Sequence, residues 1–149
     1  MRTLITIREP GVEPIPIVVE GNRFADPDDG SIDAEVPTAH LYAVPGLADC
    51  HAHVAMENIE ESGLLSDDDI RRNCSKNAWL QVEGGVLLIA DKGSPSDVSL
   101  EILDAPPESR PIMEMAGRMI APADGYYPNA GGGVEENGLA DAVRRASTG

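Results

Sequence analysis

Two histidines separated by one residue, His51 and His53, are the side chains of this sequence best suited to chemistry. They follow the turn-forming dipeptide Pro45-Gly46 and a short run that is typical of a strand. Alternate side chains of a strand point to the same face, so Asp49 is expected beside the two histidines and Cys50 on the opposite face. Two neutral imidazoles at this spacing can bind one ion of zinc, iron or nickel.

The neighbours of the histidines suggest further roles. Asp49 is expected to orient an imidazole without binding the ion itself. Cys50 is not expected to act as a nucleophile, because it points away from the pair and the sequence shows no histidine partner for it. The alternative for a lone His-x-His is a strand end with no function. The only other histidine of the chain is His40.

Composition excludes several classes of function. The formal net charge of −15 over 149 residues argues against a nucleic-acid-binding protein, which needs a basic surface. No apolar run approaches the ~20 residues of a membrane helix, and the first residues are too polar for a signal peptide. The two cysteines have no disulfide spacing, so a reduced, cytoplasmic protein is expected.

The first 44 residues are predicted to form a small β module. Two apolar runs, at residues 3–7 and 15–19, read as strands. Pro16 predicts an edge position for the second strand, since proline has no N–H for a ladder. The acidic loop over 25–33 lacks the closing glutamate and flanking helices of a calcium loop, so it is interpreted as a solvated turn.

After Gly46 the pattern alternates between strands and helices. Ser66 is a good N-cap for a helix over 67–83, with an apolar stripe at i, i+4, i+8 spacing. The apolar run 86–90 is typical of a parallel strand that is buried on both faces. Alternating elements predict a parallel sheet with right-handed crossovers. The remaining expected elements are a helix from 96 or 97 to 103, a strand over 112–116, a loop over 124–133 and a helix over 139–146.

The string from Pro45 to His53 resembles the signature Pro-Gly-x-x-Asp-x-His-x-His of the amidohydrolase superfamily. The segment 80–93, where a helix ends in glycine and Asp91-x-Gly93 closes an apolar strand, is similar to the second barrel strand of that family. Segment 118–133 resembles more loosely the glycine-rich loop after the third strand in imidazolonepropionase-like and dipeptidase-like members.

The resemblance implies an α/β fold, with residues 45–149 forming about three units of a TIM (β/α)8 barrel and residues 1–44 forming part of a β-sandwich. It implies a divalent metal ion with His51 and His53 as ligands. Zinc is the first expectation, and iron or another divalent metal is the alternative. The reaction expected from the family is hydrolysis of a carbon–nitrogen bond other than a peptide bond, such as a cyclic amide or amide, in a small-molecule substrate. A bound divalent ion lowers the pKa of its water enough to supply a nucleophile near neutral pH.

The sequence also departs from the family. The resemblance calls for further histidines from the fifth and sixth strands and an aspartate from the eighth, and a barrel takes roughly 200 residues or more. His40 precedes the barrel and is not expected to replace them. The chain alone is therefore expected to be an incomplete, inactive amino-terminal part, completed by another chain or by a homo-oligomer.

Alternatives remain from other classes of protein. One is a non-catalytic α/β module that binds a partner or a metal. A nucleotide-binding domain is disfavoured, because no G-x-G-x-x-G follows a strand. Asp91 is interpreted as a turn aspartate, and a role in the metal site is the weaker alternative. Tyr126, Tyr127 and Asn129 are substrate-contact candidates in the loop, although plain loop residues are the simpler interpretation.

Overall fold

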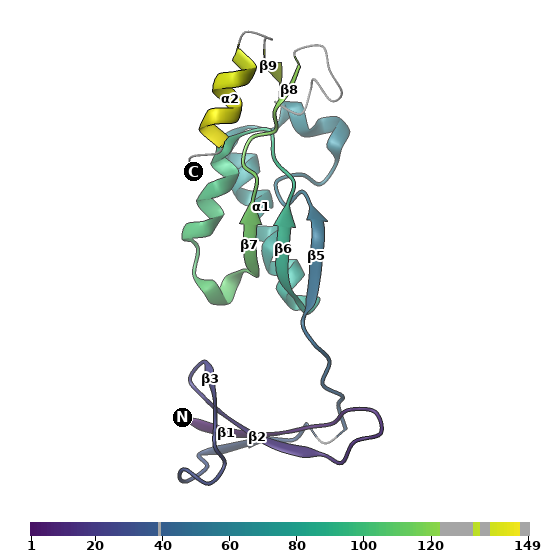
Figure 1. Ribbon diagram of the computed structural model, residues 1–149, viewed down its shortest axis with the longest axis vertical. Helices are drawn as coiled ribbons and strands as arrows, with labels where there is room; N and C mark the ends of the chain where they lie inside the picture. Colours follow the sequence, from purple (N-terminus) through teal and green to yellow (C-terminus); the bar gives the residue numbers. More distant parts are fainter. Residues whose placement is uncertain (39, 123–132, 135–137, 147–149) are drawn as a thin grey trace. The chain divides into compact units, whose positions relative to one another are not determined.

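The computed structural model describes residues 1–38, 40–122, 133–134 and 138–146 (Figure 1). The chain divides into two compact units, Met1–Pro45 and Gly46–Gly149. The predicted loop over 124–133, with Tyr126, Tyr127 and Asn129, lies outside the described residues except for Gly133.

The first unit is a four-stranded sheet. Its spatial order is β3-β2-β1-β4, with β1 antiparallel to β2 and parallel to β4. Both predicted strands lie within it, and β2 turns into β3 through a hairpin that includes Gly21 at φ 62°. The strands are β1 (Arg2–Ile7), β2 (Ile15–Glu20), β3 (Arg23–Ala25) and β4 (Ala34–Val36).

The predicted edge position of the second strand is wrong, because β2 lies between β1 and β3. The short strand β3 pairs only with Val18, Val19 and Glu20. Pro16 lies beyond the end of β3, so its missing N–H removes no hydrogen bond to that strand. Proline is thus tolerated in an internal strand at a position that the neighbouring strand β3 does not reach.

The second unit contains a parallel sheet in the order β5-β6-β7, as the alternating pattern predicts. The strands are β5 (Leu47–Ala52), β6 (Val86–Asp91) and β7 (Ile112–Met115), followed by the parallel pair β8 (Ala121–Pro122) and β9 (Gly133–Val134). The helices are η1 (Ile59–Leu64), α1 (Asp67–Glu83), η2 (Asp97–Asp104), η3 (Pro107–Ser109) and α2 (Leu139–Ala146), of which η1, η2 and η3 are 3₁₀ helices.

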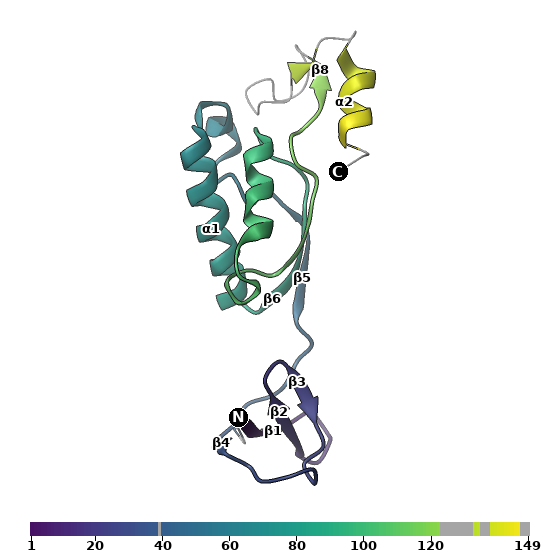
Figure 2. The same cartoon turned by 90° about the vertical axis from the view of Figure 1, so that its left-hand side faces the viewer.

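Helix α1 has the predicted bounds. The Ser66 hydroxyl accepts a hydrogen bond from the Asp69 amide, and the Asp69 carboxylate accepts one from the Ser66 amide, which completes a capping box. Ile70, Cys74 and Ala78 are buried as the apolar stripe predicts. Helices α1 and η2 lie on the same face of the β5-β6-β7 sheet (Figure 2).

Removing the cap of α1 is expected to destabilise the second unit. Ser66→Ala deletes the acceptor for the Asp69 amide, and such losses cost about 1 kcal/mol. The matched control is Ser75→Ala, since the Ser75 hydroxyl only donates to the Arg71 carbonyl within the helix and its loss is expected to be neutral or slightly stabilising. Urea unfolding followed by the fluorescence of Trp79, the only tryptophan, measures both. Equal losses in the two variants would contradict this account of the cap.

The sheet of the second unit buries one face against its helices. Ile89 and its register partner Met113 are both buried in the core with Ile70. Leu88 and its register partner Ile112 belong to the other face and are 38% and 70% exposed. The prediction that 86–90 is buried on both faces is therefore wrong for the part of the chain that is described, because both helices that follow the strands cover the same side.

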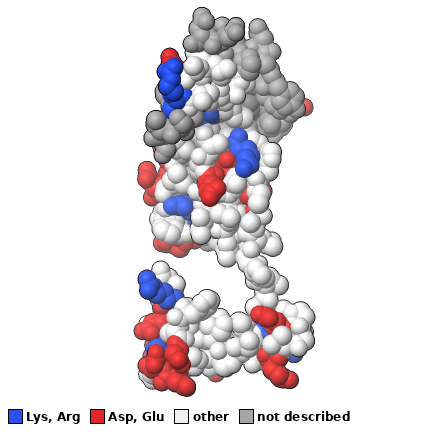
Figure 3. All heavy atoms as spheres, in the orientation of Figure 1, with Lys and Arg blue, Asp and Glu red and all other residues white. Residues whose placement is uncertain are grey.

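On the face shown in Figure 3, Asp and Glu side chains are spread over both units, and the described Lys and Arg side chains lie apart from one another. None of the described helices is both long enough and apolar enough to span a membrane.

Candidate metal centre

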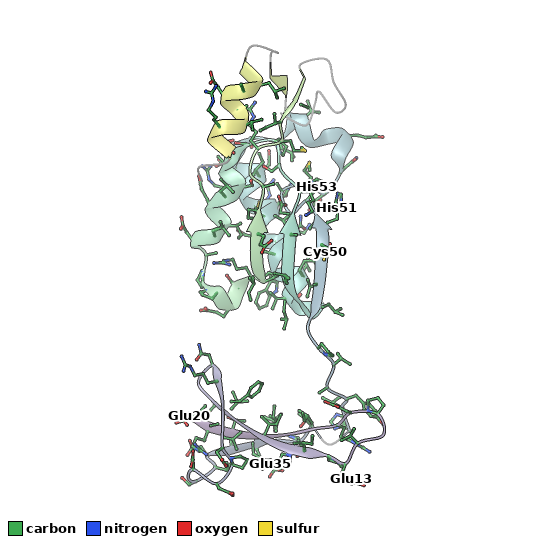
Figure 4. All side chains as sticks on the ribbon, viewed as in Figure 1. Glu13, Glu20, Glu35, Cys50, His51 and His53 are labelled. Atoms are coloured by element: carbon green, nitrogen blue, oxygen red, sulfur yellow. The ribbon has the colours of Figure 1, made fainter. Side chains whose placement is uncertain are left out.

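The two histidines lie at the carboxyl end of β5 (Figure 4). His51 is in the strand and exposed, whereas His53 follows the strand and is partly buried. Their ring centroids are 5.4 Å apart and their planes meet at 69°. The strand thus brings the two imidazoles together, as the His-x-His spacing predicts. Cys50 is an exposed free thiol.

Strand β5 is irregular at this point. Asp49 pairs with Ile89 of β6, and the next described pair joins Ala52 to Asp91. Strand β5 therefore advances one residue more than β6, which is the mark of a β-bulge. The Asp49 carboxylate accepts a hydrogen bond of 3.0 Å from the backbone amide of His51 inside the bulge. The contact of Asp49 is thus with the His51 backbone, which it holds in the irregular conformation.

The His53 ring is oriented by a backbone carbonyl. Its Nδ1 lies 2.9 Å from the carbonyl oxygen of Gly93, in the loop after β6. A carbonyl oxygen can only accept, so the neutral ring must carry its proton on Nδ1 to make this bond. The lone pair then lies on Nε2, which is the arrangement that metal-binding histidines use.

Asp91 is buried beside His53, with an exposed fraction of 3%. One carboxylate oxygen accepts from the Val54 amide at 2.9 Å, and the other accepts from the Gly93 amide at 2.8 Å. Burial raises the pKa of Asp91, while the two amide hydrogen bonds oppose that rise. The bond to Gly93 is the turn contact expected from the sequence. The bond to Val54 links two distant segments and has no local signal in the sequence.

A cavity of about 610 Å³ runs along this end of β5. Its wall includes Asp49, His51 and His53 on one side and Asn77 and Gln81 of α1 on another. The helix side of this wall was not predicted from the sequence. Asn77 also donates to the Val54 carbonyl at 3.0 Å and so ties α1 to the loop after His53.

The described residues meet part of the demand of a catalytic metal ion. Such an ion needs about three protein ligands and a water. His51 and His53 fit as two of them, by residue type, proximity and the free Nε2 of His53. Among the described residues no group of three or more His, Cys, Asp and Glu side chains is arranged to hold an ion.

Comparison with known proteins gives structural matches only. No protein-family model and no curated protein matches the sequence. A prolidase crystallised with N-methylphosphonate-L-proline superposes with a TM-score of 0.65 at 16% identity, over 99% of this chain and 44% of that chain. An amidohydrolase gives 0.58 at 17% identity, over 98% and 43%. A Xaa-Pro dipeptidase with bound methionine gives 0.61 at 16% identity, over 98% and 44%.

The chain shares the fold of the corresponding part of these proteins. The match runs through both units, and it agrees with the resemblance carried by the string from Pro45 to His53. The chain spans less than half the length of these structural neighbours.

Proposed function

We propose that this chain is the metal-binding amino-terminal part of an amidohydrolase, and that the complete protein hydrolyses a carbon–nitrogen bond. The observation that carries the proposal is the pair of adjacent imidazoles at the carboxyl end of β5, in a fold that matches an amidohydrolase over 98% of this chain. In this proposal the second unit is the start of a (β/α)8 barrel, and the first unit belongs to a β-sandwich completed by further polypeptide.

The residues of the candidate metal centre each have a role in this proposal. His51 and His53 would hold a divalent ion, with zinc the first choice since imidazole nitrogen suits it. When bound, the ion supplies an acidified water as the nucleophile. The Gly93 carbonyl keeps the proton of His53 on Nδ1, and Asp49 fixes the backbone of His51. The cavity beside them would admit a small-molecule substrate.

The bond that is cleaved is proposed more broadly than the sequence suggested. The neighbours include proteins named as a prolidase and a Xaa-Pro dipeptidase. The candidate substrates are therefore cyclic amides, amides and peptides with a bond beside proline. The remaining metal ligands and the group that moves the proton would come from polypeptide equivalent to the rest of the neighbours' chains. That polypeptide is either part of the same protein or a complementing chain.

Metal binding tests the proposal directly. Titration with zinc, followed by elemental analysis after gel filtration, is expected to give up to about one equivalent bound by the wild-type chain, with loss in His51→Ala/His53→Ala. His40→Ala is the matched control, because it removes the third histidine, which belongs to the other unit. Equal binding by the wild type and the double variant would overturn the proposed centre.

A binding module without turnover is the second candidate, and the two-ligand count in the described part favours it. It predicts the same loss of zinc in the double variant. It differs in predicting no hydrolysis of N-acylproline or of a Xaa-Pro dipeptide once the zinc-loaded chain is supplied with the complementing polypeptide.

A further inference from the structure

We propose that Asp91 is a positioning residue for the metal centre, which fixes His53 in the tautomer that leaves Nε2 free by holding the backbone on both sides of the ring. The part of this inference that concerns metal rests on the proposed function. The part that concerns the tautomer does not, since it follows from the hydrogen bonds of the metal-free chain.

The bonds around His53 form a closed circuit. Val54, the residue after His53, donates its amide to one oxygen of Asp91. The other oxygen accepts from the Gly93 amide, and the Gly93 carbonyl accepts from the His53 ring. The Lys92 amide donates to the Ala52 carbonyl at 2.8 Å, which joins the same two segments next to the ends of their strands. The ring of His53 is therefore tied to both segments that Asp91 joins.

The chemistry of the circuit requires a carboxylate. Both partners of Asp91 are N–H donors, so both side-chain oxygens must accept. Asparagine has one acceptor oxygen and one donor nitrogen and leaves one amide unpaired. The side chain is almost fully buried, and a buried amide without a partner costs free energy that relaxation of the loop would recover. Relaxation of the backbone moves the His53 ring and the Gly93 carbonyl relative to one another.

The loop beyond the circuit is held firmly, so movement is expected at the histidine end. Gly93 adopts φ 115°, and Met119 occupies the space where a Cβ at this position would lie. The Ser94 amide donates to the Gly117 carbonyl at 2.9 Å, and the Met119 amide donates to the Ser94 carbonyl at 3.0 Å. These bonds leave the Asp91–Val54 link as the contact whose loss most directly frees the His53 segment.

Nitrogen-15 NMR of the metal-free chain tests the inference. Long-range ¹H–¹⁵N spectra of a neutral imidazole distinguish a protonated Nδ1 from a protonated Nε2. The wild type is expected to show His53 protonated on Nδ1. Asp91→Asn is expected to move His53 towards protonation on Nε2 and to weaken zinc binding about 10-fold or more. Asp91→Glu, which keeps both acceptor oxygens, is expected to retain more of the wild-type tautomer than Asp91→Asn.

The matched control is Asp97→Asn. The Asp97 carboxylate also accepts from a backbone amide, that of Arg118 at 2.8 Å, but it does not bond to the segment of His53. It should leave the tautomer unchanged and cost less stability than Asp91→Asn, because Asp97 is exposed and asparagine still offers one acceptor oxygen. An unchanged His53 signal in folded Asp91→Asn would overturn the inference, and so would a wild-type His53 protonated on Nε2, which is measurable even if the variant does not fold. Failure of zinc binding with the tautomer as expected would instead count against the proposed function alone.

Discussion

Replacing Gly93 by alanine is expected to destabilise the second unit by about 3 to 4 kcal/mol and to remove the hydrogen bond to His53. At φ 115° an L side chain is strained, at a cost of about 1–3 kcal/mol. A Cβ at this position would lie 2.6 Å from Cγ of Met119 and 3.3 Å from the Gly117 carbonyl oxygen, and such overpacking costs a further 1–3 kcal/mol or so. Urea unfolding followed by Trp79 fluorescence measures the loss.

Two further variants separate the causes. Gly85 also has a positive φ, 81°, but a Cβ there would meet no atom within 4 Å, so Gly85→Ala carries the backbone cost alone and should lose about 1 kcal/mol. Met119→Ala combined with Gly93→Ala removes the closest clash and should recover part of the loss. If Gly93→Ala proved no worse than Gly85→Ala, close packing around Gly93 would not be what holds this loop.

Ile89→Ala is expected to lower the free energy of unfolding by about 3 kcal/mol. Ile89 is fully buried in the centre of the sheet, and a large-to-small change there leaves a cavity. Leu88→Ala is the matched control, one residue away on the other face. Leu88 is 38% exposed, so its loss is expected to cost about 1 kcal/mol or less. Urea unfolding of both variants in the isolated chain gives the comparison.

The difference between these two variants measures how one-sided the core is. Equal losses would mean that a layer covers the Leu88 face in solution, for instance a second copy of the chain. Sedimentation of the wild type across a range of concentrations would then show the association. A large loss at Ile89 with little change at Leu88 supports the one-sided sheet seen in the described residues.

Much of the second unit could be predicted from local sequence. The capping box at Ser66 and Asp69 defines the start of α1, and the stripe through Ile70 defines its buried side, because both signals lie within a few residues of one another. The pairing of His51 with His53 was predictable for the same reason, since their proximity depends on one short strand.

Features that depend on distant segments could not be predicted. The alternation rule assumes a regular strand, and the bulge between Asp49 and Ala52 depends on how β5 meets β6. The bond from His53 to Gly93 joins loops that follow different strands. The exposure of Leu88 depends on which layers surround the sheet, and an apolar run carries no information about that.

The strand order β5-β6-β7 is also the order of the chain, and this bears on how the second unit is made. Each parallel pairing joins neighbours in the sequence, so loop closure is short for a parallel sheet and each new strand finds its partner already in place. Synthesis on the ribosome runs in the same direction. The sheet can therefore grow one strand at a time as the polypeptide emerges, with Ile89 and then Met113 joining a core begun by Ala52.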